Sequence, residues 1–487
     1  MTQDREQGVQ FPGGTGGRLS TGDTGRAVWA DAVRGVDQAL ADQIDAAGDW
    51  RKDYVHVVVA HTAAATRTSA GAVQVARAGL ASLGARMRFE RDGASSAVGE
   101  ALAGAQDGLP AQTVRGEGER RRELVLPYRG EQLRGDALRR QLDAWVRCGS
   151  VEPSCATALH RVLDEPDWLD LSDRAFALLG AGAEMGPLEA LSGWGAHVVA
   201  VDVPDERVWD RVLTAARRGA GTLTFPADGQ AQPGVDLLTR TPEVAVFVRA
   251  AAGGLPLTVG SYAYADGARH VQLVHASDAV VELVLRERPG TSYAELATPT
   301  DAFAVPQEVV DDARGRWAAR GWRGRLQGPA RRAGLYAPAY GTVATREDGS
   351  TVGIADVLVP QQGPNYLLAK RVQRWRAVAA QADGHLVSAN VAPATRTRSV
   401  TRNRVLAAAY AGAGRFGVEV FAPATSRTLM AALLVHDLRV AAPAPVQPDD
   451  LFVSGAAHGG LWRIAYSPRS VLGLAAVTGL PAALRSR

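Results

Sequence analysis

The amino-acid sequence predicts an α/β fold with a doubly wound, mostly parallel sheet and an additional N-terminal α/β domain. Residues 176–202 have the pattern of a strand, a glycine turn, a helix and a second strand. The alternation continues, with a helix predicted at 206–218 and the third and fourth strands at 222–225 and 244–248. This order is typical of a Rossmann-type sheet.

The length of 487 residues is too great for one small core, so several parts are expected. Residues 1–25 resemble a disordered Gly/Thr-rich tail. Residues 26–170 are expected to form the N-terminal α/β domain, to which the sequence assigns no role. The Rossmann-type catalytic domain spans 171–440 with an insertion at about 255–345, and 441–487 form a C-terminal extension.

Individual elements follow from local patterns. In the N-terminal part, the apolar run 54–60 predicts a strand, 72–85 a helix, 123–128 a strand, and 137–148 and 154–164 two helices. Farther along, 270–275 and 279–285 are expected as a strand and the start of a helix, and 366–380, 385–391 and 429–435 as a helix, a strand and a helix.

Composition limits the class of protein. A net charge of +3 gives no support for nucleic-acid binding, and no run of eighteen apolar residues predicts a transmembrane segment. Cys148 and Cys155 are the two cysteines, too few for a disulfide framework or a zinc cluster, so no metal is expected. The N-terminus lacks the apolar segment of a secretory signal, and a cytoplasmic location is the expectation.

The glycine turn has the features of a dinucleotide site. Gly180, Gly182 and Gly186 form G-x-G-x-x-x-G, in which the first two glycines let the backbone turn sharply and approach a pyrophosphate. Asp202 follows twenty residues after Gly182, where an acid binds a ribose 2′-hydroxyl. We therefore expect NAD or NADP as cofactor, with NAD preferred because the carboxylate repels a 2′-phosphate.

A second feature is the motif Tyr366-x-x-x-Lys370. Lys370 is one of two lysines in the chain, the other being Lys52, and composition alone would give about 0.04 such motifs by chance. Residues i and i+4 share one face of a helix, so the phenol and the ammonium are expected to project into one site. A phenol is an acid or base of use at neutral pH only where its anion is stabilised, which an ammonium does.

The glycine turn with a distant Tyr-x-x-x-Lys resembles the short-chain dehydrogenase/reductase superfamily. The strand after the Tyr/Lys helix runs into Asn390, Pro393 and Thr397, which is similar to the family segment that borders the nicotinamide. The resemblance implies Tyr366 as general acid/base, and Lys370 as the residue that binds the ribose and lowers the tyrosine pKa. The family's serine has no counterpart at the usual distance, and Ser350 is the candidate for that hydroxyl.

Other polar groups could replace that serine, namely Gln361, Gln362 and Asn365. The function that the resemblance implies is an NAD(P)-dependent oxidoreductase acting on a small-molecule carbonyl or alcohol, with a homo-oligomer as in many relatives. A carrier-linked substrate is a further option, because residues 313–332 carry seven arginines and no acid. Two alternatives stay open: a catalytically silent nucleotide-binding sensor or scaffold, and a methyltransferase that uses S-adenosylmethionine.

Overall fold

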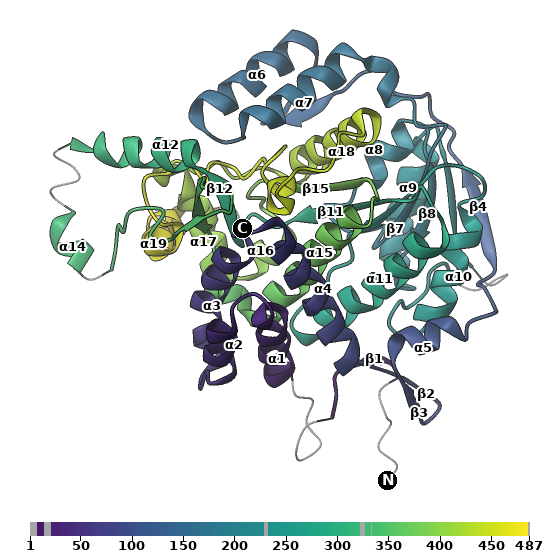
Figure 1. Ribbon diagram of the computed structural model, residues 1–487. Coiled ribbons are helices and arrows are strands. Elements are labelled where there is room, and N and C mark those ends of the chain that lie inside the picture. Colours follow the sequence, from purple (N-terminus) through teal and green to yellow (C-terminus); the bar gives the residue numbers. More distant parts are fainter. Residues whose placement is uncertain (1–6, 14–20, 228–231, 322–326, 333, 486–487) are drawn as a thin grey trace.

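The structure is a computed structural model that describes residues 7–13, 21–227, 232–321, 327–332 and 334–485 (Figure 1). It is a mixed α/β protein whose central feature is a seven-stranded sheet flanked by helices. Within the described ranges, no helix combines the length and apolar character needed to cross a membrane.

Six strands of the central sheet are parallel. In spatial order the sheet is β15-β11-β10-β7-β8-β9-β4, and only β4 runs antiparallel to its neighbour. The strands are β7 (Ala175–Leu179), β8 (His197–Val201), β9 (Thr222–Pro226), β10 (Leu257–Ser261), β11 (Ser292–Ala297), β15 (Val387–Val391) and β4 (Ala111–Arg115). In chain order the parallel strands lie 3-2-1-4-5-6 from one edge to the other, an order compatible with the predicted Rossmann-like fold.

Helices cover both faces of this sheet. Strand β7 shows why: Ala177 and Leu179 belong to the core on one face, and Phe176 and Leu178 to the core on the other. A strand buried on both sides has the continuous apolar run seen here. One face packs on α10 (Thr241–Ala251), α11 (Ala268–Glu287) and α15 (Gly363–Ala382), the other on α8 (Leu188–Gly193), α9 (Glu206–Arg218) and α18 (Pro423–Val440).

The fourth strand is β10 rather than the predicted 244–248, which lies in α10. Pro242 stands in the first turn of α10, and the buried Val244, Ala245, Phe247 and Val248 follow helical spacing. Residues 270–285, expected as a strand and a helix, are likewise one continuous helix, α11.

The N-terminal region is mainly helical and shares its core with the central sheet. Its elements are α1 (Thr21–Arg34), α2 (Gln38–Asp45), α3 (Trp50–Ala65), α4 (Ser69–Arg86), α5 (Val98–Ala103) and the small sheet of β1 (Gly8–Gln10), β2 (Arg88–Arg91) and β3 (Ala94–Ser96). Residues 8–10 and 21–25 thus belong to a strand and a helix, against the tail predicted for 1–25, while 1–6 and 14–20 lie outside the described residues. A separate N-terminal α/β domain is not confirmed, because α1 and α4 pack on α15 and β4 joins the main sheet.

The predicted strand 54–60 is wrong, since these residues lie in helix α3. Tyr54, Val55, Val58 and His61 are buried, while the residues between them are more exposed. Buried residues that follow each other after one, three and three positions lie on one face of a helix. Packing of this face therefore outweighs the β-propensity of the valine-rich run. The helix predicted at 72–85 is confirmed within α4.

An outer layer lies over α18. It consists of α6 (Gly135–Cys148) and α7 (Pro153–Asp164), which confirm two predicted helices (Figure 1). The hairpin β5 (Leu126–Tyr128) and β6 (Glu131–Leu133) precedes them, and η2 (Pro166–Leu169) follows. The predicted strand at 123–128 is therefore limited to its last three residues.

The insertion follows β11 and ends before α15, so it begins later than the predicted 255. It contains β12 (Ala302–Pro306), α12 (Gln307–Ala318), α14 (Gly328–Arg332), β13 (Val343–Thr345), β14 (Thr351–Asp356) and η3 (Pro360–Gln362). Strands β12, β14 and β13 form a separate antiparallel sheet. After β15 the chain forms α16 (Arg398–Arg402), α17 (Arg404–Gly412) and η4 (Ala413–Phe416), and after α18 come η5 (Pro448–Phe452) and α19 (Pro468–Arg485), which packs on α17.

Candidate active site

A tyrosine and a threonine meet at the carboxyl end of β11. The phenol of Tyr366, near the start of α15, donates a hydrogen bond of 2.9 Å to the hydroxyl of Thr298, which directly follows β11. Thr298 in turn shares a 2.9 Å hydrogen bond with Thr300. Tyr366 is partly exposed, while both threonines are buried. The phenol is therefore hydrogen-bonded to a pair of linked threonine hydroxyls. It lies at the carboxyl edge of the sheet, where Rossmann-type proteins bind ligands.

Lys370 lies one helical turn after Tyr366. Its ammonium donates to the side-chain oxygen of Gln373 at 2.8 Å, and Gln373 donates to the backbone and hydroxyl oxygens of Ser261 at the end of β10. The pKa of Lys370 is lowered, because the effect of burial outweighs the opposing effect of the nearby Glu295 charge. The pKa of Tyr366 is raised, because burial outweighs its bonds to the threonines, so the lowering predicted from Lys370 does not prevail. The pair therefore stands in an environment that changes the proton affinity of both groups.

Two further polar groups, Glu295 and His270, lie close to this pair. Glu295 on β11 is buried, and neither of its carboxylate oxygens has a protein partner. Burial raises its pKa to about 7, against the opposing charges of Lys370 and Arg374. The buried ring of His270 on α11 stacks at 5.9 Å from the ring of Tyr366, and burial together with the Lys370 charge keeps its pKa well below the usual range. His270 is thus a neutral neighbour.

A buried ion cluster fixes α15 against the segment that carries Thr298. Asp301 is fully buried and accepts from Arg371 at 2.8 Å and from Arg374 at 2.7 Å. Both arginines also donate to the backbone oxygen of Ala302. Such a cluster holds the start of the insertion and the helix in one register. It therefore sets the position of Thr298 relative to Tyr366.

The glycine turn lies between β7 and α8, as predicted. Gly180 has a φ of +93°, and an added Cβ would come within 2.5 Å of the backbone of Ala263, in the loop after β10. A side chain is excluded here on both grounds. The same loop reaches the tyrosine, because the ring of Tyr264 lies 6.5 Å from that of Tyr366. The turn and the Tyr/Lys helix thus border one region.

The other glycines pack less closely, and the helix is short. A Cβ on Gly182 would meet Val208 at 2.6 Å, and one on Gly186 would meet the backbone oxygen of Ala183 at 3.2 Å. Helix α8 spans six residues. Asp202 follows β8, and its carboxylate accepts from the backbone of Gly182 at 2.7 Å and of Val203 at 2.8 Å. Burial raises the pKa of Asp202, although these two bonds lower it.

The other predicted residues are distributed along the chain after β14. Asn390 is buried on β15, where its amide donates to Asp437 at 2.7 Å, on the α18 side of the sheet. Pro393 follows β15 and is buried, and the hydroxyl of Thr397 bonds Ser399 at 2.9 Å. This segment returns to the glycine turn, since the backbone of Arg398 donates to Glu184 at 2.8 Å.

Ser350 lies elsewhere, in the exposed turn between β13 and β14. Its backbone closes that turn with Arg346 and Asp348. The hydroxyl that the structure places against the phenol belongs to Thr298. Sequence reasoning missed it because the strand directly before it, residues 292–297, was not recognised: its sequence Ser-Tyr-Ala-Glu-Leu-Ala includes a serine and a glutamate and is not a continuous apolar run.

Within the described part of the chain, no group of three metal-ligating side chains is present. No protein-family model matches the sequence, and no curated protein is significantly similar to it. The site must therefore be interpreted from its own residues.

Proposed function

We propose that the protein is an NAD(P)-dependent oxidoreductase that interconverts a carbonyl and an alcohol, as short-chain dehydrogenases/reductases do. The observation that supports this most strongly is the 2.9 Å hydrogen bond from Tyr366 to Thr298, with Lys370 one turn away. A general acid needs a proton near the substrate oxygen and a hydroxyl partner that orients both. A cytoplasmic location and a small-molecule substrate belong to the same proposal.

In this proposal Tyr366 gives its proton to the carbonyl oxygen during reduction and takes it back during oxidation. Thr298 holds the phenol in place and can donate its own hydroxyl proton to the same oxygen. Lys370 stabilises the phenolate, which is the form that oxidation requires. An ammonium whose pKa is lowered by burial can also pass a proton on at neutral pH.

The residues of the glycine turn fit a dinucleotide. The positive φ of Gly180 and the absence of a side chain there let the chain turn sharply beside the ends of β7 and β8, where Rossmann-type proteins bind a pyrophosphate. In this proposal Asp202 accepts from a ribose hydroxyl, and Lys370 donates to the second ribose. A bound nicotinamide would supply the hydride. Asp202 favours NAD over NADP, because its carboxylate repels a 2′-phosphate.

A catalytically silent nucleotide-binding scaffold is the second candidate. Two observations favour it: burial raises the pKa of Tyr366, and the Lys370 ammonium donates to Gln373. A scaffold of this kind would bind the nucleotide, and the Tyr366 hydroxyl would have no catalytic role. The third alternative, a methyltransferase, gives Tyr366 and Lys370 no role.

Thermal-shift measurements with NAD, NADP and S-adenosylmethionine, followed by a screen of aldehydes, ketones and alcohols for change in nicotinamide absorbance, separate these functions. The proposal predicts stabilisation by NAD and turnover of at least one substrate class. Stabilisation by NAD without turnover of any class supports the scaffold, and stabilisation by S-adenosylmethionine alone supports the methyltransferase.

A further inference from the structure

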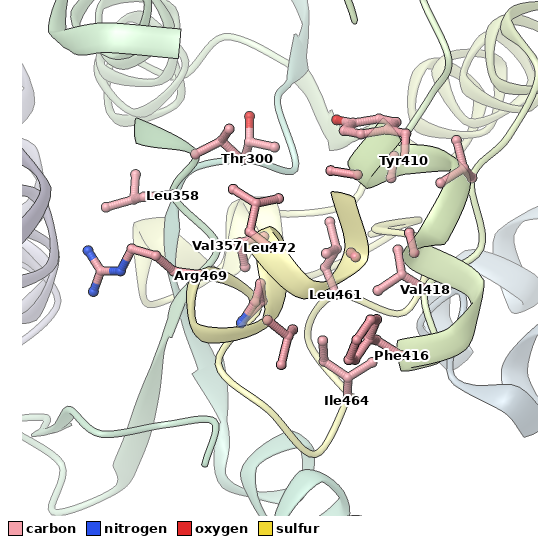
Figure 2. Close-up of a pocket in the computed structure, with 18 residues that line it drawn as sticks. Thr300, Val357, Leu358, Tyr410, Phe416, Val418, Leu461, Ile464, Arg469 and Leu472 are labelled. Atoms are coloured by element: carbon pink, nitrogen blue, oxygen red, sulfur yellow. The ribbon is translucent and has the colours of Figure 1, made fainter. Parts of the chain in front are cut away.

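An apolar pocket lies beside the Tyr366 site (Figure 2). It is partly open to solvent, and its walls are mostly apolar, as those of small-molecule sites are. Four parts of the chain outside the parallel sheet build it: Thr300 before β12, residues 357–359 after β14, residues 394–420 after β15, and residues 461–475, which lead into α19. The pocket is thus formed by parts that this chain adds to its central sheet.

The pocket connects to the catalytic hydroxyls at one end. Thr300, whose hydroxyl bonds that of Thr298, is part of the lining, and so is Tyr410. Tyr410 is close enough to Tyr366 that the tyrosine charge contributes, after burial, to raising its pKa. Figure 2 shows Thr300 and Tyr410 together at the upper end, with Phe416 and Ile464 at the lower end. We call the end nearest these hydroxyls the hydroxylic end, although the surface that faces the pocket is almost entirely apolar throughout.

The rest of the lining is hydrocarbon. Its one charged residue is Arg469, whose guanidinium is turned away from the pocket (Figure 2) and paired with Asp356. Ala394, Val418 and Ile464 form a small buried cluster of their own, separate from the two large cores. Tyr410, Ala413 and Leu461 pack against this cluster, and the apolar space that these side chains border is one that an apolar ligand would fill.

The outer wall is held tightly in place. Helices α17 and α19 touch backbone to backbone: a Cβ on Gly412 would lie 2.0 Å from the backbone oxygen of Ala475, and one on Gly479 would lie 2.0 Å from that of Ala408. Contact this close leaves no room for the helices to approach further and fill the space from outside. The pocket is therefore a built feature of the fold.

We propose that this pocket binds the hydrocarbon part of the substrate, so that the oxidoreductase acts on a primary alcohol or aldehyde with an extended aliphatic chain. The proposal rests on the proposed function. The carbon that carries the oxygen would lie at the hydroxylic end, near Thr298 and Tyr366. The chain would extend past Tyr410 towards Phe416 and Ile464. Each methylene removed from water then strengthens binding about fourfold until the pocket is full.

The test uses straight-chain primary alcohols from 1-butanol to 1-decanol, titrated calorimetrically into the full chain without cofactor. Val471→Phe and Val418→Phe fill the pocket from two walls, at residues that are 3% and 6% exposed. Val477→Phe is the matched control, because it makes the same change on α19 at a residue 72% exposed. Circular dichroism melting shows whether each variant folds. If one of the two filling variants does not fold, the other is used for the comparison.

The expected result is a steady gain in affinity with chain length in the wild type and in Val477→Phe. Both filling variants should lose at least tenfold affinity for the longest alcohols and little for 1-butanol. Affinity that is independent of length, or filling variants that bind as the wild type does, would overturn the assignment of the pocket.

Nicotinamide reduction with the same alcohols separates this proposal from the function itself. Length-dependent binding without any reduction of NAD or NADP would refute the oxidoreductase function. It would still support the proposal that the pocket binds an aliphatic chain. Reduction at the same kcat/KM with short and long alcohols would support the oxidoreductase and refute the role of the pocket.

Discussion

Tyr366 and Thr298 are 68 residues apart in the chain, and their hydroxyls lie 2.9 Å apart in the structure. The insertion between them folds as a sheet and helices beside the main sheet, so the end of β11 and the start of α15 still meet. Asp301 directly follows Thr300 in the chain and forms ion pairs with two arginines of α15. These ion pairs hold Thr298 and Tyr366 in place. This geometry is the basis of the predictions below.

Thr298→Val should lower turnover about 10²-fold or more, because it keeps the shape of the side chain and removes the acceptor of the Tyr366 proton. The Thr298 bond lowers the pKa of Tyr366, so its loss should also move the acidic limb of the kcat/KM profile for alcohol oxidation, which reports the general base, to higher pH. Thr298→Ser restores the hydroxyl and is the control. A valine variant with wild-type turnover and pH profile would show that Thr298 only packs.

The sequence was sufficient to predict the glycine turn and the Tyr/Lys helix, because both depend on local patterns. Gly180 lies between a strand and a helix, and Tyr366 and Lys370 lie one turn apart on α15. Thr298 was missed because spacing along the chain does not show where an insertion begins. The 3-2-1-4-5-6 strand order depends on long-range pairing that periodicity cannot reveal.

Rarity of a residue type proved an uneven guide. Lys52, the other lysine, is an exposed residue of α3 paired with Asp49, an ordinary surface position. Asn403 caps α17 by accepting from the backbone of Val405 and Leu406, which is a structural role. Lys370 stands apart from both because burial and Glu295 act on it, and no composition argument contains that information.

Asp202→Asn should weaken NAD binding by roughly 10- to 100-fold, the usual effect of losing a hydrogen bond to a charged group, and leave NADP binding unchanged or stronger. The asparagine keeps an oxygen for the Gly182 backbone, so the turn should persist. Asp205→Asn, three residues later, is the matched control, because Asp205 caps α9 and asparagine caps equally well. Calorimetric titration with both nucleotides measures the effect. Equal losses for NAD and NADP would contradict the assigned role.

Glu295 predicts a pH dependence of stability. Its pKa is about 7 in the fold, because of burial, against an ordinary value of 4.5, so the folded state binds more protons in this window. The free energy of unfolding should therefore fall by on the order of 3 kcal/mol as the pH rises from about 4.5 to about 7. Glu295→Gln should remove this loss, while Glu308→Gln, at an exposed position of α12, should keep it. Urea unfolding across this range decides, and identical pH slopes for wild type and Glu295→Gln would refute the prediction.

Asp301→Ala should destabilise the fold by about 3–5 kcal/mol, because it leaves Arg371 and Arg374 buried without their counter-charge. Asp383→Ala is the contrast. It removes an ion pair with Arg77 in which both side chains are at least half exposed, and such pairs contribute about 0–1 kcal/mol. Chemical denaturation of both variants provides the comparison. Similar losses would mean that the buried cluster does not anchor α15.

The central claim is that Tyr366 moves the proton in a nicotinamide-dependent reaction. Its most direct test is the rate of change in nicotinamide absorbance, at saturating cofactor, for the wild type and Tyr366→Phe, with calorimetric cofactor binding measured on both. Removal of one hydroxyl should lower the rate about 10²–10⁴-fold and leave the cofactor Kd nearly unchanged. Tyr264→Phe, whose hydroxyl bonds Asp266, should keep the wild-type rate. A Tyr366→Phe variant with full activity would contradict the account.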